Sequence, residues 1–206
     1  NLEKNFDLKI LSGNIGIGHV RWATHGVPNS INAHPHSSEN VSVVHNGIIE
    51  NSDQLKKEFE KSGTIFKSQT DTEVITVLLT EKLKKLDPLK AVFETIDILK
   101  GSFALGIIFK NHKNFVIGAR RGSPLAVGYS NNENYLGSDS YALKSMTNKI
   151  SYLDDGDVCV LSKDEVKFYN HNKDKINKEI FTLSEDKASV SKGNYKNFMI
   201  KEIFEQ

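Results

Sequence analysis

The stretch from His19 to Ile49, HVRWATHGVPNSINAHPHSSENVSVVHNGII, decides how the chain is interpreted because it holds two apolar segments and a long polar connection. Residues 15–22 and 41–49 have the composition of β-strands. Residues 23–40 contain a glycine, two prolines and several asparagines and serines. A loop of that length without structure of its own is often functional. The sequence therefore predicts two strands joined by a loop that carries chemistry.

Three helices are predicted after the second strand, at residues 52–61, 71–83 and 88–100. Asn51 or Ser52 can cap the first helix, and Pro88 occupies the first position of the third. Thr70-Asp-Thr-Glu73 has the spacing of a capping box, with Thr70 as the N-cap of the second helix. A short strand is predicted at residues 64–67.

The rest of the chain predicts mainly strands, with a short helix at 139–146, a turn at Asp155-Gly156 and a loose polar tail at 170–194. The predicted strands are 102–109, 115–119, 125–129, 135–137, 150–153, 157–161 and 166–169. Strands grouped together, with adjacent helices between two groups, predict an α+β fold of packed sheets covered by helices. Strict alternation of strands and helices, the mark of a doubly wound sheet, is not seen.

Composition narrows the class of protein. Of 206 residues, 38% are hydrophobic and 26% are charged, and the net charge is +1, which is ordinary for a globular domain. No basic stripe predicts a nucleic-acid partner, and no apolar stretch is long enough to predict a membrane span. The single cysteine, Cys159, lies in an apolar run and is predicted to be a buried structural thiol in a cytoplasmic protein.

Histidines mark the candidate site, since five of the seven fall in the first 45 residues: His19, His25, His34, His36 and His45. Titratable groups crowded beside two strands indicate a functional site. One alternative is a metal site at His34-Pro-His36. Zinc sites usually add a carboxylate or thiolate at motif spacing, and none follows here, so we expect neither a metal nor a cofactor.

Several motifs occur in one order along almost the whole chain. They are His19-Val-Arg-Trp-Ala-Thr-His-Gly26, Asn32-Ala-His-Pro-His36, His45-Asn-Gly-Ile-Ile-Glu-Asn51, Thr70-Asp-Thr-Glu73, Arg120-Arg-Gly-Ser-Pro124, Gly137-Ser-Asp139 and Met199 to Gln206. Together they resemble the class II glutamine amidotransferases, and the Arg-Trp-Ala-Thr-His-Gly form resembles the glucosamine-6-phosphate synthase branch. The resemblance implies the N-terminal-nucleophile hydrolase fold, a four-layer αββα sandwich of two antiparallel sheets.

The resemblance also implies roles for individual residues. Asn46, through its side-chain amide, and Gly47, through its backbone N–H, match the pair that stabilises the oxyanion of the reaction. The simpler alternative is an Asn-Gly turn. Arg21 matches the residue that binds the α-carboxylate of glutamine, or else it forms a surface ion pair. Asp71 matches the residue that binds the α-ammonium group, and it could also stabilise a helix N-terminus.

Further residues match the lining of the same pocket. Thr24 and His34 match pocket residues, and Trp22 matches a position that gates the passage of ammonia. The loop at residues 21–29, which contains His25, resembles one that closes over bound glutamine.

The family's nucleophile is an N-terminal cysteine, and this sequence begins with Asn1. We therefore expect residues 1–206 to be one glutaminase domain that lacks its first strand and nucleophile, truncated at both ends, with the isomerase domain absent and the fragment inactive. The expected partners are glutamine, and fructose 6-phosphate through the isomerase domain, in a parent enzyme that forms a homodimer. A degenerate module that binds a ligand or partner without catalysis is the alternative.

Overall fold

The structure is a computed structural model that describes residues 13–21 and 26–183. Its helices are α2 (Ser52–Lys61), α3 (Thr72–Leu83), α4 (Pro88–Ile98) and α5 (Ser140–Leu143). Its strands are β1 (His36–Ser37), β2 (Val41–Ile49), β3 (Gly101–Phe109), β4 (His112–Arg121), β5 (Ala126–Tyr129), β6 (Asn134–Gly137), β7 (Lys149–Tyr152), β8 (Val158–Ser162), β9 (Val166–Tyr169), β10 (Lys175–Ile176) and β11 (Phe181–Thr182).

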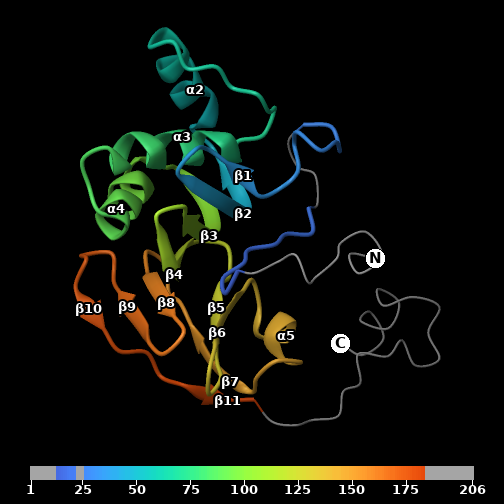
Figure 1. Cartoon of the computed structure of the whole chain (residues 1–206), viewed down its shortest axis with the longest axis vertical. Coiled ribbons are helices and arrows are strands. Elements are labelled where there is room, and N and C mark those ends of the chain that lie inside the picture. The colour runs from blue at the N-terminus through green and yellow to red at the C-terminus, as the bar shows by residue number, and fades with distance from the viewer. Residues whose placement is uncertain (1–12, 22–25, 184–206) are drawn as a thin grey trace, which may run out of the picture.

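In the described residues these strands form two antiparallel sheets. The large sheet has the order β1-β2-β3-β4-β8-β9-β10, and the small sheet has the order β11-β7-β5-β6. Figure 1 shows α2, α3 and α4 at one side of the molecule and α5 at the other, beside the small sheet.

The first layer of core lies between the large sheet and helices α2–α4. Strand β3 alternates, so that every second side chain, Phe103, Leu105, Ile107 and Phe109, is buried against this helical layer. The helices contribute Leu55, Val74, Ile75, Leu78, Leu79, Ala91, Val92, Phe93 and Ile96. This period of two in the strand and three to four in the helices is the pattern that buries one face of each element.

The second layer of core lies between the two sheets. The large sheet contributes small groups from β3 and β4 to this layer: Ala104 belongs to it, and a Cβ at Gly106 or Gly118 would meet Leu136 of β6. Cys159 also belongs to this cluster and is fully buried. Burial raises the pKa of its thiol to about 12, so the prediction of a buried structural cysteine is confirmed.

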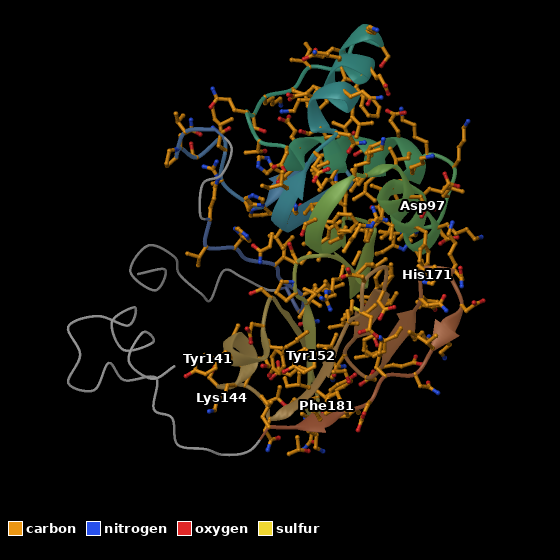
Figure 2. The ribbon with its side chains drawn as sticks, turned by 180° about the vertical axis from the view of Figure 1, so that it is seen from behind. Asp97, Tyr141, Lys144, Tyr152, His171 and Phe181 are labelled. Carbon is orange, nitrogen blue, oxygen red and sulfur yellow. The ribbon has the colours of Figure 1, made fainter. Side chains whose placement is uncertain are left out.

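The third layer of core lies between the small sheet and α5, where Ala126, Leu143 and Ile150 are buried together. In the same sheet, the exposed Tyr152 of β7 and Phe181 of β11 form an aromatic pair with ring centroids 6.1 Å apart (Figure 2). Helix, sheet, sheet and helix are thus joined by three layers of side chains, which confirms the predicted αββα sandwich.

Two predicted strands are wrong. Residues 15–21 pair with no strand among the described residues, and Val20 is 88% exposed. Residues 64–67 also form no strand, because the N–H groups of Lys67 and Ser68 donate to the Glu73 carboxylate instead of to a neighbouring strand. These bonds hold the pKa of Glu73 below its ordinary value, although burial alone would raise it.

The predicted capping box is wrong for the same reason. Glu73 is engaged by Lys67 and Ser68, and the Thr70 hydroxyl pairs with His36 Nε2 at 2.9 Å. Helix α3 therefore begins after Asp71, which makes no side-chain cap. In contrast, Asp87 caps α4 by accepting a hydrogen bond from the Lys90 N–H.

The polar segment after residue 170 is more ordered than predicted as far as Leu183. Strands β10 and β11 lie there, and Lys178 between them donates to Asp154 at 2.6 Å and also pairs with the buried Asp157. The loop between β9 and β10 is likewise tied to the end of α4 through Lys173 and Asp97 (Asp97 is labelled in Figure 2). None of the described helices is long and apolar enough to cross a bilayer.

Candidate active site

A cavity of about 430 Å³ opens beside β2 and the N-terminal end of α3. Its lining contains five of the residues singled out from the sequence: Arg21, His34, Asn46, Gly47 and Asp71. Its size lies within the ordinary range of small-molecule sites. The three other candidates, Trp22, Thr24 and His25, lie outside the described residues.

The position of Asn46 and Gly47 follows from the pairing of β2. Both lie within β2, opposite Ala104 and Phe103 of β3, so they do not form a turn. Gly47 has φ +129°, and a Cβ built on it would lie 2.1 Å from the Ser102 carbonyl oxygen. Glycine is therefore required here by both backbone conformation and space. The Asn46 side chain is exposed to the cavity.

Asp71 reaches the same cavity from the start of α3. Its side chain is buried, and Oδ2 accepts a hydrogen bond from the Ile49 backbone N–H at 2.8 Å. The carboxylate therefore stands two residues along the strand from Gly47. This position at a helix N-terminus also suits a negative charge.

Arg21 contributes the positive charge of the site. Its guanidinium donates to the carbonyl oxygens of Gly26 and Val27 at 3.1 and 3.3 Å. The same Val27 carbonyl accepts a hydrogen bond from the buried Asn32, whose amide also binds Gln69. The backbone on which Arg21 rests is thus fixed by two amide side chains.

Four of the five clustered histidines gather at this end of the molecule. The rings of His19 and His34 stack with centroids 4.4 Å apart, and His36 meets His34 edge-on at 5.1 Å. Burial, with the neighbouring His19, His36, His45 and Arg21, lowers the pKa of His34 to about 3. His34 is therefore neutral at physiological pH.

The cavity is also lined by residues for which no role is predicted from the sequence. His19, Val20, His45, Thr72 and Ser138 line it. In the sequence, His19 and His45 belong to the histidine cluster and to two of the ordered motifs, and Ser138 belongs to a third motif. His19 Nε2 lies 2.6 Å from Asn46 Oδ1, a contact that no local spacing indicates.

Within residues 13–21 and 26–183, no three His, Cys, Asp or Glu side chains are grouped to hold a metal ion.

The fold and this cavity define the class of protein. The profile of a family described as a glutamine amidotransferase domain matches residues 19–145, and the chain belongs to that family. Among solved structures it is similar to the glutamine phosphoribosylpyrophosphate amidotransferase of B. subtilis complexed with ADP and GMP, at 25% identity and a TM-score of 0.63, over 76% of this chain and 35% of that one. The fold is that of the N-terminal-nucleophile hydrolases.

Curated relatives are more similar still in sequence. The chain is 47% identical over 207 residues to the glutamine–fructose-6-phosphate aminotransferase (isomerizing) of Mesorhizobium japonicum, covering 100% of this chain and 34% of the relative. It is 49% identical over 197 residues to the enzyme of the same name from Zymomonas mobilis, covering 95% of this chain and 32% of the relative. The chain therefore spans about a third of the length of these relatives.

Proposed function

We propose that this domain binds glutamine in the cavity beside β2 and positions its side-chain amide for hydrolysis to glutamate and ammonia. The observation that carries the proposal is the shared lining: a guanidinium, a buried carboxylate and the Asn46-Gly47 pair surround one space of about 430 Å³. These are the groups that an amino acid with a terminal carboxamide requires.

Recognition of the amino-acid end falls to two charged side chains. Arg21 offers a planar, two-pronged donor for the α-carboxylate. Asp71 offers a carboxylate for the α-ammonium group, and burial of Asp71 strengthens that attraction relative to one in open water. His34, neutral and half-enclosed, lines the same space. Thr24, Trp22 and His25 are proposed to complete the substrate contacts from the loop.

Stabilisation of the reaction falls to Asn46 and Gly47. The Ile49 N–H points away from β3 toward Asp71, and N–H groups alternate between the two edges of a strand. The Gly47 N–H, two residues earlier, is therefore expected to face the same edge. Together with the Asn46 side-chain amide it would provide two donors for an oxyanion.

The attacking group is proposed to be a cysteine thiolate from outside residues 1–206. It adds to the carboxamide carbon, and the amide nitrogen takes up the proton that the thiol gave up. The oxyanion then collapses and expels ammonia, and water cleaves the thioester to release glutamate and restore the thiol. Cys159 does not suit this role, because it is fully buried between the sheets and its thiol has a raised pKa. We expect residues 1–206 alone to release no ammonia from glutamine, and release that disappears in Cys159→Ala would contradict this assignment.

By analogy with the curated relatives, we propose that the domain works within a larger enzyme, and the family resemblance of the sequence leads us to propose that this enzyme is a homodimer. There the ammonia would pass to fructose 6-phosphate to form glucosamine 6-phosphate. An isomerase domain would bind the sugar phosphate, so residues 1–206 are assigned only the glutaminase half of the reaction.

Calorimetric titration of the chain with L-glutamine tests the proposal. Arg21→Lys and Asp71→Asn are expected to weaken binding at least about tenfold, as loss of a charged hydrogen bond does. Asp53→Asn is the matched control, since Asp53 is an exposed acidic residue in the first turn of α2.

Glutaramate, which lacks the α-ammonium group, sharpens the test. Asp71→Asn should bind this analogue no more weakly than the unaltered chain does, because the charge partner of Asp71 is missing. If the folded chain does not bind glutamine, or if Asp71→Asn and Asp53→Asn behave alike, the proposal is wrong.

A further inference from the structure

The side-chain amide of Asn46 can serve an oxyanion only in one of its two orientations. An amide presents a donor nitrogen on one side and an acceptor oxygen on the other. The nitrogen stabilises negative charge, whereas the oxygen repels it. Some group must therefore hold the oxygen of Asn46 away from the substrate.

The ring of His19 is placed to hold the side-chain oxygen of Asn46 in this way. His19 Nε2 lies 2.6 Å from Asn46 Oδ1, across 27 positions of sequence. We propose that His19 is a positioning residue: its Nε2–H donates to Asn46 Oδ1 and so turns Asn46 Nδ2 toward the substrate amide. This inference rests on the proposed glutaminase function.

The surroundings of His19 select the tautomer that this role needs. Its other nitrogen, Nδ1, is buried and has no hydrogen-bond partner within the described residues. A proton on Nδ1 would leave a buried donor unpaired and would set the Nε2 lone pair against the Asn46 oxygen. A proton on Nε2 avoids both costs and leaves only an unpaired acceptor at Nδ1, and buried acceptors without a partner are less rare in proteins than buried N–H groups without one.

Neighbouring groups fix the two partners. His34 stacks on the His19 ring at 4.4 Å with an angle of 30° between the planes, which restricts the direction of Nε2. Asn46 is held in β2 by its pairing with Ala104. Among residues 13–21 and 26–183, Asn46 Nδ2 hydrogen-bonds to no other group, and Asn46 lines the cavity. Its two N–H bonds are therefore available to substrate.

A double-mutant cycle in the full-length enzyme that carries this domain tests the inference. His19→Leu, Asn46→Ala and the double variant are compared by kcat and KM for glutamine hydrolysis. Loss of one oxyanion donor typically lowers kcat about a hundredfold. We expect His19→Leu to lower kcat by about that factor with little change in KM, and the double variant to be no slower than Asn46→Ala.

His19→Gln provides the rescue. The amide nitrogen of glutamine reaches roughly the place of histidine Nε2 and can donate to Asn46, so we expect its kcat to exceed that of His19→Leu at least about tenfold. Three results would overturn the inference. They are losses of kcat that multiply in the double variant, an effect of His19→Leu on KM alone, and equal kcat values for His19→Gln and His19→Leu when both keep an unchanged Tm.

The tautomer is measurable without catalysis. Long-range proton–nitrogen NMR spectra of the 206-residue chain, assigned with His19→Gln, should show His19 protonated on Nε2 and not on Nδ1. The opposite tautomer would overturn the inference even if glutamine binds. Conversely, failure of the unaltered chain to bind glutamine would defeat the proposed function while the NMR result still reports on His19.

Discussion

The Asp71 carboxylate accepts a hydrogen bond from the Ile49 backbone N–H at 2.8 Å. One side chain thereby joins the start of α3 to the end of β2 and brings a negative charge to the cavity that Asn46 and Gly47 line. The structural role of Asp71 and its proposed role in binding therefore depend on the same carboxylate, and substitutions can separate the two.

Asp71→Ala is expected to destabilise the domain by about 1–3 kcal/mol, since the Ile49 N–H loses its acceptor. Asp71→Asn keeps an acceptor oxygen, and it should cost less than about 1 kcal/mol while still weakening glutamine binding. Denaturant unfolding of the two variants measures the difference. Equal losses of stability would show that the Ile49 bond is not what Asp71 contributes to the fold.

Gly47→Ala is expected to destabilise the domain by at least about 2 kcal/mol, through a left-handed backbone and a clash with the Ser102 carbonyl. Gly63→Ala is the matched control: Gly63 also has a positive φ, +91°, but among the described residues no atom beyond Gly63 and its two chain neighbours lies within 4 Å of its Cβ position. Its expected cost is only about 1 kcal/mol. Similar midpoints of unfolding for the two variants would argue against the close approach of β2 and β3 at Gly47.

His34 is expected to make the fold sensitive to mild acid. The unfolded chain takes up a proton near the ordinary histidine pKa of 6.5. Folded His34 does so only near pKa 3, because it is partly buried and faces His19, His36, His45 and Arg21. The unfolded state thus binds more protons between these values, so the free energy of unfolding falls as pH falls from about 6.5 to about 3.

Between pH 7.5 and pH 5.5, His34 is expected to lower the free energy of unfolding by about 1 kcal/mol. The decrease should be smaller by that amount in His34→Gln, which cannot titrate. The lowered pKa of His36 acts in the same direction and remains in both proteins. Parallel pH profiles for the two proteins would contradict the expected neutral His34.

Lys178→Met is expected to cost about 3 kcal/mol, because it leaves the buried Asp157 without its cation. Lys173→Met is the control. Its partner Asp97 is about half exposed, with 55% of the side chain accessible, so that exposed pair should contribute less than about 1 kcal/mol. Thermal unfolding that ranks Lys173→Met as the more damaging change would refute this account of the segment between β10 and β11.

Local signals in the sequence predicted some elements well. Pro88 and the preceding Asp87 place the start of α4, and the apolar run at residues 41–49 matches β2. Local signals failed where a distant group competed. Thr70 has the sequence of an N-cap, yet its hydroxyl pairs with His36, 34 residues away. Residues 64–67 have a strand-like pattern, yet the N–H groups of Lys67 and Ser68 bind Glu73.

In the candidate site, too, some features could be predicted from the sequence and others depend on contacts between distant residues. Resemblance to a family selected Arg21, Asn46, Gly47 and Asp71, which line one cavity. The contact between His19 and Asn46 could not be predicted, because nothing in the spacing of two residues 27 positions apart specifies which ring nitrogen meets which amide atom. Such details depend on the pairing of β2 with β3 and on the stacking of histidines, which only the folded chain defines.

Strand β3 turns phenylalanine, leucine and isoleucine toward the helices and keeps Ala104 and Gly106 for the other sheet. Because side chains alternate with a period of two, a shift of β3 by one residue would turn its phenylalanine rings toward the other sheet, where Ala104 and Gly106 now lie. Mispairing of this strand therefore carries its own steric penalty. The alternation of large and small side chains in β3 therefore does more than pack the two sheets. It also favours the observed alignment of β3 with β2 over one that is shifted by a single residue.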